Sequence, residues 1–250
     1  MRQAWVTVDL GFGDQGKGSV CDFLVRRFGA HTVVRYNGGA QAAHTVVLPD
    51  GRFHTFAQLG AGSFVPGVET LLAERVVISP WTMLIEARRL GTVGVDDALA
   101  RMRIDGRCVV ATPYHAAANR AHELARGAGR HGSCGLGIGE AVVDARRLGP
   151  DETLFARDLV DPATTRAKLA RIRERKQAEI GDSLGNIASL SLPDFDRNLL
   201  CDSQSPEHLS MFIEEVRSRV SVVDESAIFA RLSKKGTIVF EGAHGVLLDE

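Results

Sequence analysis

The first 45 residues combine short apolar runs with one segment of helical periodicity. The run AWVTVDL (4–10) is rich in β-branched residues and precedes the loop GFGDQGKG, so it predicts a buried strand that ends in a glycine loop. Apolar positions between Ser19 and Phe28 have helical spacing, and Gly29 marks the end of that helix. HTVVRY (31–36) predicts a second strand, followed by the loop NGGAQAAH. This order predicts a βαβ unit with parallel strands and a right-handed crossover.

The rest of the chain continues the alternation. HTVVLPDGRFHTF predicts a hairpin that turns at Asp50 and Gly51. ERVVIS (74–79) and RCVVAT (107–112) predict strands that each lead into a helix through Ser-Pro or Thr-Pro. Residues 131–144 predict a second glycine-rich loop, 162–180 and 206–220 predict helices with solvated charged faces, and GTIVFEG (236–242) predicts the last strand. We therefore expect an α/β fold with a mainly parallel central sheet and flanking helices, forming a single domain over residues 1–250.

The composition argues against a membrane-spanning protein and against nucleic acid or a membrane as partner. No apolar run approaches the roughly 18 residues that a membrane span needs. Thirty basic and 31 acidic residues give a formal net charge of −1, so no overall field favours nucleic acid or a membrane as partner. The four cysteines are scattered without CxxC spacing, which is typical of reduced thiols, and we expect a cytoplasmic protein.

The first glycine loop is the strongest local signal for a binding site. Residues 11–17 fit the phosphate-loop spacing G-x-x-x-x-G-K between a strand and a helix, where backbone N–H groups, the helix N-terminus and Lys17 attract an anion. Gly18 stands where such loops have a Ser or Thr for Mg²⁺, and Ser19 comes one residue later. Asp14 inside the loop would repel phosphate unless it is a metal ligand or a general base. The alternative is a turn with a purely structural role.

The second loop, residues 37–45, follows the neighbouring predicted strand. Ligands in open α/β sheets bind outside the carboxyl ends of the strands, so we expect both loops to line one crevice. His44 would then face Asp14 and could donate a proton to a leaving oxygen. A histidine beside small residues is more often structural, and it is the position of His44 beside the phosphate loop that makes it a catalytic candidate.

Five segments together resemble the adenylosuccinate synthetase family: GFGDQGKG, VVRYNGGAQAAHTVV, VVISPWTML, YHAAANRAHELARGAGRHGSCGLGIGEAVVD and FEGAHGVLLD. The resemblance covers essentially the whole chain. It implies a C–N-forming ligase of purine biosynthesis that joins L-aspartate to the 6-position of IMP with GTP as co-substrate. In that chemistry the 6-oxygen is first phosphorylated and then displaced by the aspartate amino group, with one Mg²⁺ ion present.

The resemblance also implies roles for individual residues. Asp14 resembles the general base that also contacts Mg²⁺, Lys17 the lysine that holds the transferring phosphoryl group, and His44 the general acid. The backbone carbonyl of Ala43 resembles the second protein ligand of the metal. Arg146 resembles an arginine that reaches the nucleotide of a partner subunit in a homodimer, and Arg147 is an equally possible register. The implied nucleotide- and phosphate-binding positions are Gly13, Gln15, Gly16, Gly18, Ser19, Gln41, Ala42, Ala43, Thr45, Cys134, Arg146 and His244.

The chain departs from the family pattern at positions that contact the nucleotide. RYQGGxNAGHT becomes RYNGGAQAAHT, so Gln41 replaces an asparagine and Ala43 a glycine. GTTGRGIGP becomes GSCGLGIGE, where Cys134 replaces a threonine and Leu136 an arginine, and FEGAQG becomes FEGAHG, where His244 replaces a glutamine. The base, the acid and the loop lysine are unchanged. This pattern favours retained phosphoryl transfer, with two alternatives: a ligase for another purine nucleotide such as (d)GMP, or a catalytically silent nucleotide-binding paralogue.

Family members continue well beyond the block FEGAQGxLLD. Their further segments include a guanine-recognising KxD-type segment and an aspartate-binding loop, which do not occur in these 250 residues. We therefore expect the domain to be incomplete at its C-terminal end.

Overall fold

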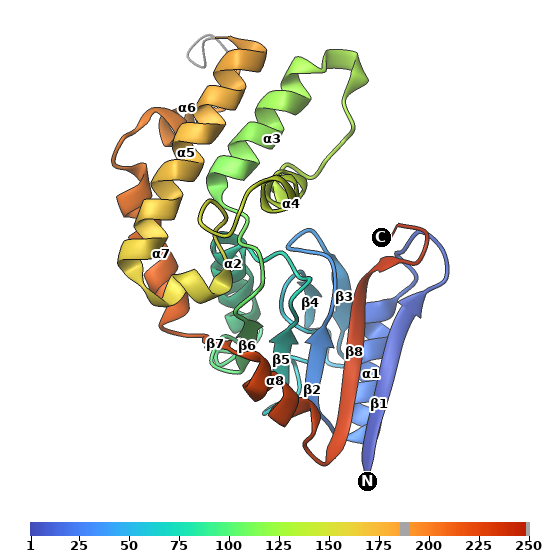
Figure 1. Ribbon diagram of the computed structural model, residues 1–250. Coiled ribbons are helices and arrows are strands. Elements are labelled where there is room, and N and C mark those ends of the chain that lie inside the picture. Colours follow the sequence, from blue (N-terminus) through green and yellow to red (C-terminus); the bar gives the residue numbers. More distant parts are fainter. Residues whose placement is uncertain (186–190, 249–250) are drawn as a thin grey trace.

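A six-stranded, entirely parallel sheet forms the centre of the computed structural model, which describes residues 1–185 and 191–248 (Figure 1). This confirms the predicted α/β fold with a parallel central sheet. A separate antiparallel pair, β3 (His44–Val47) and β4 (Phe53–Phe56), confirms the predicted hairpin. The order across the sheet is β1 (Arg2–Asp9), β8 (Gly236–Gly245), β2 (Ala30–Arg35), β5 (Glu69–Leu72), β6 (Met102–Asp105) and β7 (Ser221–Val223).

Strand β8 lies between β1 and β2. These two strands are parallel, as the predicted βαβ unit requires, but they do not pair with each other. Val239 of β8 is instead the register partner of Trp5 on one side and of Val33 on the other. A segment about two hundred residues downstream thus lies between the first two strands of the chain, next to the edge strand β1, and its end lies beside both N-terminal loops.

Helices cover the two faces of the sheet unequally. α1 (Lys17–Phe28) packs against β1, β8 and β2 on one face, whereas the short α8 (Glu225–Leu232) packs on the other (Figure 1). α2 and α3 begin after the predicted N-caps Ser79 and Thr112, whose side chains accept backbone hydrogen bonds. The remaining bounds are α2 (Pro80–Gly91), α3 (Pro113–Ala125), α4 (Ile138–Arg147), α5 (Pro162–Leu184), α6 (Asp194–Cys201) and α7 (Ser205–Arg217).

Three predictions of local structure are wrong. The runs 74–79 and 107–112 are buried connections that form isolated bridges, such as that of Ile78 with Val110, because β5 and β6 end earlier, at Leu72 and Asp105. Apolar periodicity could not separate a buried loop from a strand in such short runs. The second glycine loop is also shorter than predicted, since α4 begins directly after Gly137, whose φ is 71°.

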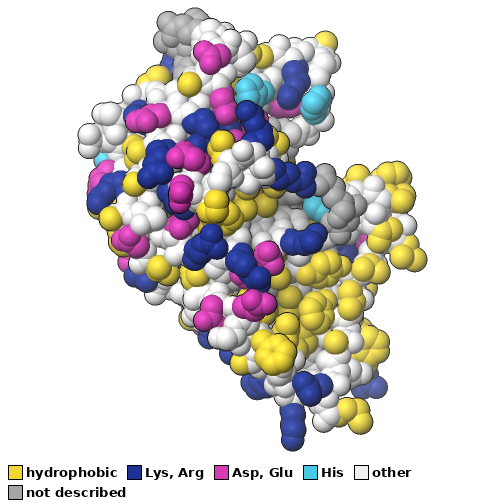
Figure 2. All heavy atoms as spheres, viewed as in Figure 1, with side chains coloured by type: hydrophobic (Ala, Val, Ile, Leu, Met, Phe, Trp, Pro, Cys, Tyr) yellow, Lys and Arg dark blue, Asp and Glu magenta, His cyan; other side chains and the backbone are white. Residues whose placement is uncertain are grey.

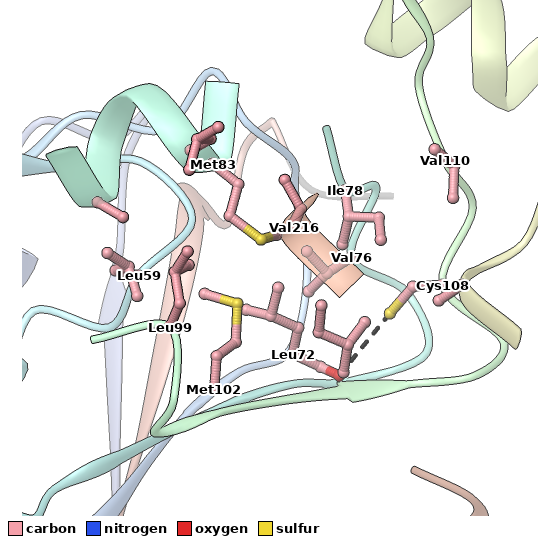
Figure 3. Packing of buried hydrophobic residues seen from close by; sticks show 14 of the residues in the cluster. Leu59, Leu72, Val76, Ile78, Met83, Leu99, Met102, Cys108, Val110 and Val216 are labelled. Atoms are coloured by element: carbon pink, nitrogen blue, oxygen red, sulfur yellow. Dashed lines mark hydrogen bonds between the residues drawn. The ribbon is translucent and has the colours of Figure 1, made fainter. Parts of the chain in front are cut away.

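The main hydrophobic core lies between the sheet and the helices around α2. Figure 3 shows Leu72, Ile78 and Met83 packed together with Cys108, whose Sγ donates hydrogen bonds to the carbonyls of Leu72 (3.7 Å) and Ala73 (3.2 Å). Burial raises the pKa of the Cys108 thiol well above its ordinary value. All four cysteines are free thiols. Within the described residues, no helix combines the length and the apolar character that a membrane crossing requires.

One region of the sheet keeps its apolar side chains in solvent. Figure 2 shows hydrophobic groups gathered over the face that carries β1 and β8, and α8 covers only part of this face (Figure 1). β1 is an edge strand, and its Val6 and Val8 are exposed together with Leu10 and Phe12 of the following loop. An exposed apolar edge of this kind is unusual for a monomeric protein.

The charged face of α5 is less solvated than predicted, because Lys168 and Lys176 are both buried. The ammonium of Lys176 donates to Asp144 Oδ1 (2.8 Å) and Glu179 Oε2 (2.8 Å), and Asp144 Oδ2 lies 3.3 Å from Nε2 of His115. Burial alone would raise the pKa of Asp144, but the hydrogen bonds from His115 and Lys176 hold it well below its ordinary value. This network joins α3, α4 and α5.

We predict that Lys176→Met lowers the free energy of unfolding by about 3–5 kcal/mol, because it leaves a buried carboxylate without its main cation. The matched control is Arg166→Met on the same helix. The exposed guanidinium of Arg166 pairs with Glu207 at 2.8 Å, and its loss should cost less than about 1 kcal/mol. Urea denaturation of the three proteins measures both values. Equal losses in the two variants would contradict the role assigned to the network.

Candidate active site

The glycine loop between β1 and α1 carries the features of an anion site. Asp14 has a φ of 57°, so a non-glycine residue adopts the left-handed conformation there. Gly16 caps α1 with a φ of 87°, and among the described residues no side chain caps the first turn of the helix. The N–H groups of that turn therefore remain available to a bound anion, whose charge the helix N-terminus favours.

Gly18 is required by the close approach of two segments. A Cβ atom at this position would lie 2.9 Å from the carbonyl carbon and from the Cβ of His44. This contact explains why the position that holds a Ser or Thr in a standard phosphate loop is a glycine here. Ser19, the next residue, donates its hydroxyl to the carbonyl of Thr45 at 3.3 Å.

The two loops line one cavity of about 210 Å³, as the sequence predicted. Asp14 and His44 both contribute to its wall, so the predicted base and the predicted acid share one space. Asp14 is exposed, whereas Lys17 and His44 are buried. The full lining consists of Asp14, Gln15, Gly16, Lys17, Gly18, Ala43, His44 and Thr45.

A buried carboxylate that sequence reasoning missed holds His44. Glu241, near the end of β8, is fully buried; its Oε1 lies 2.5 Å from Nδ1 of His44, and its Oε2 accepts the N–H of Ala61 at 2.9 Å. Burial alone would raise the pKa of Glu241, but the charge of Arg35 and the hydrogen bond from His44 hold it below its ordinary value. Glu241 is therefore ionised at neutral pH. The only sequence signal was its place in the FEG segment at the end of the last strand.

A second missed carboxylate, Asp9, contacts the groups that attract phosphate. It is the last residue of β1, and its Oδ2 accepts hydrogen bonds from the ammonium of Lys17 and from the N–H of Gln15 (3.4 Å). Lys17 and Asp9 are both buried. The carboxylate of Asp9 thus already pairs with the ammonium of Lys17 and with one backbone N–H group of the loop. An incoming phosphate group would use the same two groups.

Two of the positions that depart from the family pattern lie together. Nε2 of Gln41 is 3.5 Å from Nε2 of His244, which follows Glu241 by three residues on β8. Oε1 of Gln41 is buried without a partner among the described residues. These side chains form a polar pair beside the 37–43 loop, and neither belongs to the lining of the phosphate-loop cavity described above.

The predicted residues of the second glycine loop and of α4 lie outside this cavity. Cys134 is exposed in the second glycine loop, and Arg146 and Arg147 are exposed in the last turn of α4. The start of α4 approaches the first loops, because a Cβ on Gly39 would lie 3.0 Å from Cγ2 of Ile138. The lining of the 210 Å³ cavity, as far as the described residues show it, does not include Cys134 or Arg146.

The donor set in the cavity fits a hard divalent cation. Asp14 supplies a carboxylate and Ala43 a backbone carbonyl on the same cavity wall, and Mg²⁺ prefers such oxygen ligands. Mg²⁺ keeps several waters and takes few protein ligands, so two are sufficient. The described residues contain no cluster of three or more His, Cys, Asp or Glu side chains that could hold a metal ion.

Comparisons with known proteins show the family of the chain. The sequence model of the family described as Adenylosuccinate synthetase matches residues 6–250. The chain belongs to the adenylosuccinate synthetase family. Adenylosuccinate synthetase of Neisseria gonorrhoeae (strain ATCC 700825 / FA 1090) is 31% identical over 254 residues, which cover 100% of this chain and 54% of that protein. The enzyme of Psychrobacter cryohalolentis is 34% identical over 241 residues, covering 95% and 51%.

Solved structures show the same fold. A fully ligated adenylosuccinate synthetase from Plasmodium falciparum matches with a TM-score of 0.74 at 19% identity, over 99% of this chain and 52% of that one. The succinoaminodeoxyadenylate synthetase of cyanophage S-2L, bound to dGMP and dATP, matches with a TM-score of 0.61 at 19% identity, over 98% and 52%. The chain therefore spans about half the length of its family relatives.

We predict that Asp9→Asn strengthens the binding of inorganic pyrophosphate by roughly tenfold, because it removes the anion that competes for Lys17. The amide oxygen of asparagine can still accept a hydrogen bond, so the loop should keep its fold. Calorimetric titration of both proteins measures the change, and Asp50→Asn in the exposed β3–β4 turn serves as the control for loss of a single negative charge. Weaker binding by Asp9→Asn would show that Asp9 helps to form the anion site.

Proposed function

We propose that this chain carries the phosphoryl-transfer and proton-transfer half of a GTP-dependent ligase that joins L-aspartate to the 6-position of IMP. The observation that supports it most strongly is the shared cavity, in which a phosphate loop, a carboxylate and a buried histidine meet. Family membership supplies the reaction class. The substrates, the co-substrate and the homodimer that the family resemblance implies at Arg146 belong to this proposal.

Each residue of the cavity has a role that its environment supports. Asp14, exposed on the loop, removes the N1 proton of the purine and moves negative charge onto the 6-oxygen. Lys17 and the first turn of α1 hold the transferring phosphoryl group. The 6-oxygen takes the γ-phosphoryl group of GTP, and GDP leaves. The amino nitrogen of aspartate then forms the new C–N bond and gives up a proton, while the C6–O bond breaks and the phosphorylated oxygen leaves as phosphate. His44 donates a proton to the oxygen that leaves.

A magnesium ion is part of the proposed site. Asp14 and the carbonyl of Ala43 would hold it, and the ion would neutralise charge on the phosphoryl oxygens. Asp14 therefore has to serve both the metal and the substrate. This double use explains why a carboxylate is tolerated inside a loop that binds anions.

The assay for this function uses the complete gene product that contains these residues. It follows release of GDP and phosphate from GTP and Mg²⁺, with a panel of purine nucleotides paired with amino acids. We expect release only when a 6-oxopurine nucleotide and an amino acid are both present. Asp14→Asn should lower kcat by about 10²-fold or more while changing nucleotide affinity little, because a general base acts in the transition state. Asp50→Asn is the matched control. No release with any pair would favour the silent nucleotide-binding paralogue.

A second candidate is a ligase for a guanine nucleotide such as GMP or dGMP. The observation that favours it is the Gln41–His244 pair, in which both residues differ from the family pattern and one amide oxygen is buried without a described partner. An acceptor in that position could pair with the 2-amino group that distinguishes guanine from hypoxanthine. The phage relative of the same fold is a structure with bound dGMP.

We predict that the double variant Gln41→Asn, His244→Gln moves nucleotide preference toward IMP by at least about tenfold in kcat/KM. Loss of a matched hydrogen bond can change discrimination by up to about 10⁴-fold, whereas shape alone gives about 10–200-fold. The measurement compares IMP, dIMP, GMP and dGMP in the variant and the parent. His31→Gln, at the opposite end of β2, is the matched control for the histidine exchange. An unchanged ranking would show that these two residues do not select the nucleotide.

A further inference from the structure

We propose that Glu241 is a positioning residue that fixes the tautomer of His44, so that Nε2 is the nitrogen presented to a ligand in the cavity. The proposal deepens the proposed function, on which the role of His44 in turnover rests. None of the relatives' names assigns a role to this carboxylate. It acts through His44 and does not line the cavity itself.

The hydrogen bonds of Glu241 determine which ring nitrogen of His44 carries the proton. Its Oε2 accepts the N–H of Ala61 at 2.9 Å, and its Oε1 lies 2.5 Å from Nδ1 of His44. A carboxylate that is ionised can only accept hydrogen bonds, so Nδ1 must carry a proton. The carboxylate cannot rotate away without losing the backbone contact, because it is fully buried.

The other ring nitrogen is left for a ligand. Nε2 of His44 is buried and has no partner among the residues that the structure describes, although the side chain lines the cavity with Asp14 and Lys17. A buried polar atom without a partner is costly and is often found where a ligand completes the site. The first turn of α1 and the phosphate loop lie on the same cavity wall. The ligand group that meets Nε2 is therefore an oxygen of a phosphorylated substrate.

The tautomer with its proton on Nδ1 is the form that His44 adopts after it has acted as a general acid through Nε2. The imidazolium form carries protons on both nitrogens, and the Nε2–H bond breaks while its electron pair stays on nitrogen. The proton forms a new O–H bond on the ligand. The ring that remains is neutral with its proton on Nδ1, and this is the form that Glu241 binds. Glu241 therefore contacts a protonated Nδ1 both before and after transfer.

The variant Glu241→Gln makes a specific test possible. A glutamine has one acceptor and one donor group, and the N–H of Ala61 requires the acceptor. The amide NH₂ group must then face Nδ1 of His44, which can accept it only when the proton is on Nε2. The substitution should thus reverse the tautomer of the neutral ring without removing a side chain.

Nitrogen NMR of protein labelled with ¹⁵N-histidine, recorded at alkaline pH, reads the tautomer directly. We expect Nδ1 of His44 to give a protonated shift and Nε2 an unprotonated one in the wild type, with the two reversed in Glu241→Gln. The spectrum of His44→Gln assigns the signals. Asp144→Asn, which breaks the buried contact with His115 on α3, is the matched control and should leave the His44 signals unchanged.

Measurements of kcat and KM distinguish a role of Glu241 in positioning His44 from a purely structural role. Glu241→Gln should lower kcat by about 10²–10⁴-fold with little change in the KM for nucleotide, since the wrong nitrogen then carries the neutral ring's proton. A purely structural role would change KM and thermal stability instead, and would overturn the proposal. A wild-type ring with its proton on Nε2 would overturn it too, even if the variant does not fold. An Nδ1-protonated ring in a protein that consumes no GTP would support the positioning and contradict the proposed ligase.

Discussion

The carboxylate of Glu241 is the interaction on which the geometry of the site depends. It joins four segments that are distant in sequence: β8, the hairpin through His44, the loop at Ala61 and, through its charge, Arg35 of β2. Arg35 in turn donates to the carbonyls of Ala57 and Leu59. A charge buried this deeply is stable only when all of these partners are in place. The site is therefore complete only when β8 is part of the sheet.

The same strand explains why the two loops meet. β8 separates β1 from β2 by one strand, and the two loops that follow them converge over its end. Gly245 marks this convergence, because a Cβ there would lie 2.1 Å from the carbonyl oxygen of Gly11. A topology with β1 and β2 as direct neighbours would lack the Glu241 carboxylate beneath the histidine. The insertion of β8 between β1 and β2 thus supplies a charged group that neither loop contains.

Much of this architecture could be predicted from local sequence. The first strand, the glycine loop, α1 and the helices that start at Ser79 and Thr112 depend on caps, glycines and periodicity, which act over a few residues. The placement of β8 could not be predicted, because pairing between distant strands leaves no local signal. The partners of Lys17 and His44 depend on that pairing or on burial. The chemical identity of the site was thus visible in the motifs, whereas the carboxylates that control it, Asp9 and Glu241, required the fold.

The contact between Gly18 and His44 limits what this loop could become. In a standard phosphate loop, a hydroxyl side chain at the position of Gly18 binds the metal ion. Here the backbone and Cβ of His44 stand where the Cβ of such a side chain would lie, so the clash comes from the path of the chain at residue 44 and not from the imidazole. Replacing the histidine alone would therefore not make room for the hydroxyl. The start of β3 would have to move away from α1 before this loop could carry a side chain at position 18.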